Sequence, residues 1–123
     1  MATSERRIAI VDDDASVLKA LSRLLGARSF APETYPSARA FLESLSSGQP
    51  ACLIVDLQMP EMTGLELQRH LTSNGIHIPT IVITAHNDAC SRERCTSAGA
   101  IEYLLKPLQS STLLAAIGKA IGA

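Results

Sequence analysis

The chain has 123 residues, 46% of them hydrophobic, and a formal net charge of −1. This length fits a single domain, 1–123, whose core needs no metal or disulfide to fold. Positive and negative side chains nearly cancel, so the chain has no overall positive charge that would attract nucleic acid or an anionic membrane. Apolar runs such as Ala51–Val55 are far shorter than the roughly 20 residues that cross a bilayer. We therefore expect a soluble protein.

The N-terminal stretch and the cysteines indicate the compartment. Met1–Arg7 is polar and carries no hydrophobic signal segment, so we expect a cytoplasmic protein. Three cysteines are an odd number in a domain able to fold without bridges, which favours reduced thiols. Cys90 and Cys95 have no neighbouring His or Cys pair to complete a zinc site, and we interpret them as small core fillers.

Apolar strands and amphipathic helices alternate along the whole chain. The apolar runs predict strands at Arg7–Val11, Phe30–Tyr35, Ala51–Val55, Ile78–Thr84 and Ala100–Leu105. Helical spacing follows each of them: after Asp14, from Ser37, from Thr63, over Asp88–Ala98, and after Pro107. Parallel neighbours are normally joined by right-handed crossovers through helices. The order predicts an α/β fold, a doubly wound five-stranded parallel sheet with five helices on both faces.

Local signals refine this fold. Pro32 cannot donate to a ladder on both sides, so the second strand is placed at the edge, as in the strand order 2-1-3-4-5. Asp14 is expected to cap the first helix, and Thr63 with Glu66 forms a capping box for the third. The helix over Asp88–Ala98 has an apolar side of only small residues, so we expect it to be loosely held.

Aspartates gather just past the ends of two predicted strands. Four of the five aspartates in the chain lie there: Asp12, Asp13, Asp14 and Asp56. In an open doubly wound sheet, ligands bind outside the carboxyl ends of the strands, where the strand order reverses, so these side chains should meet. Carboxylates crowded together either take up protons or bind a hard, oxygen-seeking cation such as Mg²⁺.

Two further polar residues reach the same edge of the predicted sheet. Thr84 ends the fourth strand and Lys106 follows the fifth. A metal ion, an ammonium and a hydroxyl can each stabilise the charge on the equatorial oxygens of a transferred phosphoryl group. The pattern therefore suits phosphoryl transfer onto a carboxylate oxygen.

Four motifs in this order resemble the receiver domain of two-component response regulators. They are Ile8-Ala-Ile-Val-Asp-Asp-Asp14, Val55-Asp-Leu-Gln-Met-Pro-Glu-Met-Thr-Gly64, Val82-Ile-Thr-Ala85 and Leu105-Lys-Pro107. The resemblance spans nearly the whole chain. The stretches Phe30–Leu42 and Thr84–Asp88 are most similar to the FixJ-type subgroup. The resemblance implies a flavodoxin/CheY-like fold.

The same resemblance implies roles for the acidic residues. Asp56 would accept the phosphoryl group from a phosphohistidine of a sensor histidine kinase. Asp13 and Asp56 would bind Mg²⁺ (or Mn²⁺) directly and Asp12 through water, with the backbone carbonyl of Gln58 as a further ligand. The domain would assist its own phosphorylation and dephosphorylation without being a turnover enzyme.

Roles for the remaining site residues are also implied by the family. Lys106 would pair with the phosphoryl oxygens, and its bond to Pro107 would be cis. Thr84 and Tyr103 would be switch residues, with the hydroxyl drawn toward the new phosphate and the ring turning inward. His86 is either at the rim of the site or a plain exposed histidine.

Partners follow from the resemblance as expectations. They are the sensor kinase, a second copy paired after phosphorylation through the Asp88–Ala98 helix, the fifth strand and the last helix, and a DNA-binding output domain outside this chain. The output would be transcription. We expect no membrane binding and no direct nucleic-acid binding by residues 1–123.

Two other functions fit parts of the pattern. A haloacid-dehalogenase-type phosphatase would use Asp12 as nucleophile, but it would need a late acidic pair after Lys106 and would leave Asp56 without a role. A pseudo-receiver would be a docking scaffold that never carries phosphate. Its mark would be a missing acceptor or lysine, and this sequence has both.

Overall fold

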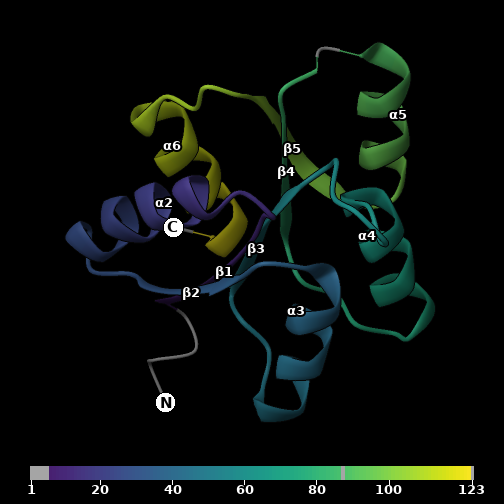
Figure 1. Cartoon of the computed structure of the whole chain (residues 1–123), viewed down its shortest axis with the longest axis horizontal. Coiled ribbons are helices and arrows are strands. Elements are labelled where there is room, and N and C mark those ends of the chain that lie inside the picture. The colour runs from purple at the N-terminus through teal and green to yellow at the C-terminus, as the bar shows by residue number, and fades with distance from the viewer. Residues whose placement is uncertain (1–5, 87, 123) are drawn as a thin grey trace.

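A five-stranded parallel sheet is covered by helices on both faces (Figure 1). The computed structural model describes residues 6–86 and 88–122, so Asn87 and most of the polar segment Met1–Arg7 lie outside it. The strands are β1 (Arg7–Val11), β2 (Ala31–Tyr35), β3 (Cys52–Asp56), β4 (Thr80–Thr84) and β5 (Ala100–Leu105). The helices are α2 (Ala15–Ala27), α3 (Ala38–Ser44), α4 (Gly64–Ser73), α5 (Ala89–Ser97) and α6 (Ser110–Ile121), with a 3₁₀ turn η1 (Leu45–Ser47).

The strand order is β2-β1-β3-β4-β5, and every neighbouring pair is parallel. This confirms the predicted fold class and strand order, including the edge position of the strand that carries Pro32. The fourth strand begins at Thr80, two residues later than the apolar run that starts at Ile78. Pro79 has no N–H for the ladder, and its carbonyl accepts from Leu53 at 2.9 Å.

Alternating side chains on the strands fill two separate cores. Ile8, Ile10 and Ile54 lie on the face that α2 and α6 cover. Val11 and Val55 lie on the opposite face, which α3, α4 and α5 cover (Figure 1). Every residue of β3 and β4 is buried, as expected for strands that have helices on both sides.

Side-chain caps fix where the helices begin. The Asp14 side chain accepts from the backbone N–H of Ser16 at 2.9 Å, as predicted for the first helix. The predicted capping box at α4 is present: Thr63 Oγ1 accepts from Glu66 N–H, and Glu66 Oε1 accepts from Thr63 N–H. These caps satisfy N–H groups that a helix leaves unpaired at its start. The caps therefore fix where α2 and α4 begin, and with that the ends of the loops that follow β1 and β3.

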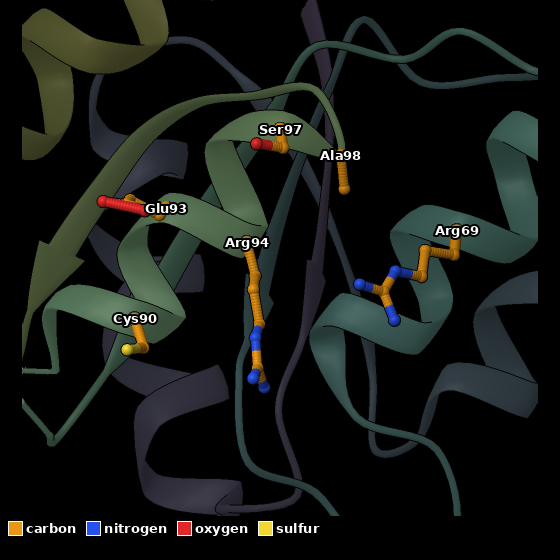
Figure 2. A pocket seen from close by; sticks show the side chains of 6 residues that line it. All are labelled: Arg69, Cys90, Glu93, Arg94, Ser97 and Ala98. Carbon is orange, nitrogen blue, oxygen red and sulfur yellow. The ribbon is translucent and has the colours of Figure 1, made fainter.

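Helix α5 has the weak apolar side that its sequence predicts. Within it, Cys95 is the only buried residue. Cys90 is exposed and lines a cleft of about 340 Å³ between α5 and α4 (Figure 2). The core-filler interpretation is therefore correct for Cys95 and wrong for Cys90, because residues five apart lie on different sides of a helix. All three cysteines are free.

None of the helices in ranges 6–86 and 88–122 has the length and apolar character that crossing a membrane requires.

Gly64 permits the close approach of α4 to the end of β3. A Cβ there would lie 2.6 Å from the carbonyl oxygen of Asp56 and 3.1 Å from Leu57 Cα, both backbone atoms. We predict that Gly64→Ala lowers the free energy of unfolding by about 1–3 kcal/mol, the usual range for overpacking. Urea denaturation monitored by circular dichroism measures this change.

Gly26→Ala in α2 is the matched control. A Cβ at Gly26 would meet nothing within 4 Å, so the substitution should stabilise the protein by about 0.5–1 kcal/mol through helix propensity. Equal effects of the two alanines would show that the contact with Asp56 does not constrain residue 64.

Candidate functional site

Backbone pairing brings the predicted site residues to one edge of the sheet. Val11 and Val55 are register partners on neighbouring strands, and Asp12 and Asp56 are the next residues along each strand. Backbone hydrogen bonds continue past the strand ends: Leu57 N–H donates to Ile83 O at 2.8 Å, and Lys106 N–H donates to Thr84 O at 2.7 Å. The loops that carry the site are therefore tied to the sheet.

Three carboxylates form a cluster at this edge. Asp12, Asp13 and Asp56 each place one carboxylate oxygen within 4.8 Å of the others. Asp12 and Asp56 are buried, whereas Asp13 is exposed. The donors are all oxygens with a surplus of negative charge, which is what hard divalent cations prefer. The residues present therefore fit Mg²⁺ or Mn²⁺.

Lys106 is the cation that this cluster already contains. Its Nζ lies 2.9 Å from Asp12 Oδ2 and 3.6 Å from Asp56 Oδ1. Burial by itself would lower the pKa of Lys106, but the hydrogen bond and attraction of Asp12, followed by those of Asp56, raise it above its ordinary value. The ammonium therefore stays charged and ties β5 to the ends of β1 and β3.

The positive charge of Lys106 does not fully offset the effects that raise the pKa of Asp56. Burial raises its pKa first and repulsion from Asp12 raises it further, while the Lys106 ammonium opposes the shift. The net direction is upward. One ammonium therefore faces two buried carboxylates, and additional positive charge at this place would favour the ionised form of Asp56.

Thr84 and Tyr103 are linked through the backbone of His86. Thr84 is fully buried at the end of β4, and its Oγ1 accepts from His86 N–H at 3.2 Å. The Tyr103 hydroxyl donates to the carbonyl oxygen of His86 at 3.3 Å. Tyr103 is only 4% exposed as a whole residue, so its ring already occupies an inward position.

The other predicted residues divide between the site and its surroundings. The Lys106–Pro107 bond is cis, as the resemblance implies. Asp14 lies outside the three-carboxylate cluster and serves as the helix cap. Gln58 follows Asp56 by two residues and has an exposed side chain, while metal binding by its carbonyl stays a prediction. The His86 side chain is exposed, and its backbone makes the contacts described above.

Two residues near the site were missed by sequence reasoning. Gly64 belongs to the quoted motif, yet nothing in the sequence shows that its α-carbon lies against the Asp56 carbonyl. The guanidinium of Arg92 lies over the Tyr103 ring, 4.9 Å from its centroid. A charged residue in a polar stretch gives no sequence signal for such a contact.

Comparison with known proteins supports one family. The model of the response regulator receiver domain matches residues 8–118. The response regulator protein TmoT of Ectopseudomonas mendocina is 41% identical over 121 residues, which cover 98% of this chain and 55% of TmoT. The transcriptional regulatory protein FixJ of Rhizobium meliloti is 39% identical over 111 residues, covering 90% of this chain and 54% of FixJ. This chain spans about half the length of these relatives.

Solved structures agree with this comparison. The crystal structure of FixJ-N shares 37% identity with a TM-score of 0.87, covering 94% of this chain and 93% of that one. The response regulator StyR shares 42% identity with a TM-score of 0.88, covering 94% of this chain and 59% of that one.

The raised pKa of Asp56 predicts that the stability of the fold depends on pH through this residue. A carboxyl with a higher pKa in the folded than in the unfolded chain costs stability at neutral pH, and this cost disappears as the pH falls below the ordinary aspartate range. Without divalent metal, Asp56→Asn should therefore be more stable than the parent at pH 7, and the two should converge in acid. Urea denaturation across this pH range measures the difference.

Asp14→Asn is the control for the general loss of one negative charge. Hydrogen bonds from Ser16 lower the pKa of the exposed Asp14, and asparagine is also a good helix cap. This variant should show no gain at pH 7. An equal gain in both variants would contradict a burial effect at Asp56.

Proposed function

The chain belongs to the response regulator receiver family, in its FixJ-type subgroup, and from this premise we propose that Asp56 is the phosphoryl acceptor of a two-component signalling system. The donor is the phosphohistidine of a sensor histidine kinase, and residues 1–123 form one receiver domain. The observation that carries the proposal is the convergence of Asp12, Asp13, Asp56 and Lys106 at one edge of the sheet.

In the proposed reaction, a carboxylate oxygen of Asp56 attacks the phosphorus atom of the donor. A P–O bond forms, the P–N bond of the phosphohistidine breaks, and its electron pair stays on the imidazole nitrogen, which takes up a proton. The product is an acyl phosphate on Asp56. Mg²⁺ or Mn²⁺, which Asp12, Asp13, Asp56 and the Gln58 carbonyl would hold, supplies positive charge for the phosphoryl oxygens.

Each neighbouring side chain has a role in this proposal. The Lys106 ammonium shifts from its carboxylate partners toward the added phosphoryl oxygens. The Thr84 hydroxyl, whose oxygen lies at the end of β4, donates to the phosphoryl group. Tyr103 would act as the second switch residue: phosphorylation would favour the inward position of its ring behind Thr84, which the ring already occupies in this structure. Phosphorylation thereby shifts a pre-existing equilibrium between two conformations of the α5–β5 region, and the domain is a switch rather than a turnover enzyme.

We propose transcription as the output, carried by a DNA-binding domain outside this sequence. Relatives such as FixJ are transcriptional regulatory proteins, and this chain spans about half their length. The α5–β5–α6 surface would pair with a second copy after phosphorylation; it includes Leu105, which is 38% exposed. The domain itself would bind neither nucleic acid nor membrane and would act in the cytoplasm.

The geometry argues against Asp12 as the nucleophile of a phosphatase. Both of its oxygens are engaged: Oδ1 accepts from Asp14 N–H and Oδ2 accepts from Lys106, each at 2.9 Å. Its exposed fraction is 0%, against 6% for Asp56. A docking scaffold that never carries phosphate would not need a charged lysine beside two buried carboxylates.

Acetyl phosphate tests the acceptor directly. Incubation with acetyl phosphate and Mg²⁺, followed by mass spectrometry of peptides, should place the added phosphoryl group on Asp56. Asp56→Asn should abolish the label while keeping the fold, and Asp14→Asn should retain it. A label on Asp12 would favour the phosphatase, and a chain that takes up no label would favour the scaffold.

Lys106→Ala separates metal binding from the response. Removal of the ammonium leaves the carboxylates with less competition for a cation, so Mg²⁺ should bind at least as tightly as in the parent. Phosphorylation should no longer change the α5–β5 region. Nuclear magnetic resonance (NMR) shifts of backbone amides, recorded during Mg²⁺ addition and after phosphorylation, measure both properties.

Lys119→Ala is the matched control, since Lys119 pairs with Glu102 at 2.9 Å on the exposed surface. It should behave like the parent in both measurements. Loss of Mg²⁺ binding in Lys106→Ala, or an unchanged response, would remove Lys106 from the proposed mechanism.

A further inference from the structure

Arg92 of α5 covers the ring of Tyr103, a residue of β5. Its guanidinium carbon lies 4.9 Å from the centroid of the ring, and Tyr103 as a whole residue is 4% exposed. Arg92 itself is exposed and makes no ion pair with any residue in ranges 6–86 and 88–122. The contact with the Tyr103 ring is therefore the tertiary interaction that the structure shows for the Arg92 side chain.

Helix α5 has little else to hold it. Its one buried side chain is Cys95, and Gln68 Nε2 of α4 donates to the Cys95 carbonyl at 3.2 Å. The Oε1 atom of the same Gln68 side chain is buried without a hydrogen-bond partner among the described residues. Helices that bury little apolar surface are drawn from the least stable parts of a protein. The contact between Arg92 and the buried Tyr103 ring therefore adds to the small buried surface that holds α5.

A chain of direct contacts connects Arg92 to Thr84, at the end of β4. The guanidinium lies over Tyr103, the Tyr103 hydroxyl donates to His86 O at 3.3 Å, and His86 N–H donates to Thr84 Oγ1 at 3.2 Å. An outward movement of the ring would break the second contact and remove one restraint on the His86 backbone, whose N–H donates to the Thr84 hydroxyl oxygen.

We propose that Arg92 is a positioning residue that holds the Tyr103 ring inward and so keeps Thr84 placed for phosphorylation. The link to phosphorylation rests on the proposed function, whereas the placement of the ring does not. A cation above an aromatic ring at an exposed position changes a two-state population by about 2- to 5-fold. Loss of the cation should therefore let the ring move outward more often, without unfolding the domain.

The sequence supplies a clean optical probe for the ring. It contains two tyrosines and no tryptophan, so in a Tyr35→Phe background Tyr103 is the only residue with tyrosine or tryptophan emission. In that background, Arg92→Gln should increase acrylamide quenching of Tyr103, while Arg92→Lys, which keeps a cation, should restore most of the protection. Circular dichroism verifies that each variant is folded.

Arg94→Gln is the matched control on the same helix. Figure 2 shows the Arg94 side chain pointing into the cleft between α5 and α4, where Arg69 also points. This variant loses the same charge and should leave Tyr103 quenching at the parent value. The rate of Asp56 labelling by acetyl phosphate should fall about 2- to 5-fold in Arg92→Gln and stay unchanged in Arg94→Gln.

The outcomes separate this inference from the proposed function. Equal quenching of Tyr103 in the parent, Arg92→Gln and Arg94→Gln would overturn the role of Arg92. Increased quenching in Arg92→Gln with an unchanged labelling rate would overturn its link to Thr84. Increased quenching in a protein that is never labelled on Asp56 would support the placement of the ring and overturn the proposed function instead.

Discussion

Two buried carboxylates that share one ammonium are the constraint on which the rest of the structure depends. Asp12 directly follows β1, Asp56 ends the neighbouring β3, and Lys106, directly after β5, reaches both carboxylates. Burial and mutual repulsion raise the pKa of Asp56, so the cluster is short of positive charge. A bound divalent cation would supply the missing positive charge, and in the proposed function Lys106 then turns toward the added phosphoryl oxygens. The charge balance of the site therefore depends on what binds there.

The fold combines a rigid part with a weakly held one. Buried central strands, side-chain caps and the close approach of Gly64 to Asp56 fix the acidic edge. Helix α5 buries only Cys95 and depends on polar contacts, among them that of Arg92 with Tyr103. In the proposed function, a change in charge at the acidic edge therefore acts on the weakly held helix α5.

The sequence carries enough information to predict the architecture. Apolar periodicity predicts the strands, and Pro32 at the sheet edge agrees with the observed order. Because the carboxyl ends of parallel strands meet, the spacing also brings Asp12, Asp13 and Asp56 together, as the structure shows. Helix geometry alone places Cys90 and Cys95 on different sides of the helix. Which of the two faces the sheet, and what Gly64 and Arg92 contact, could not be predicted in the same way. Side-chain direction on a short polar helix, backbone-to-backbone distance and cation–ring contacts depend on three-dimensional packing that periodicity does not encode.

The proposed metal site at Asp12, Asp13 and Asp56 is tested most directly by NMR with Mn²⁺, a paramagnetic ion with the same oxygen preference as Mg²⁺. Small additions of Mn²⁺ should broaden the amide signals of Asp13, Asp56 and Lys106. Signals of Gly75 and Gly99, in the loops before β4 and β5 at the opposite edge, should keep their intensity. Excess Mg²⁺ should restore the lost signals. Broadening centred on other acidic residues, with the signals of residues 13 and 56 intact, would contradict the account.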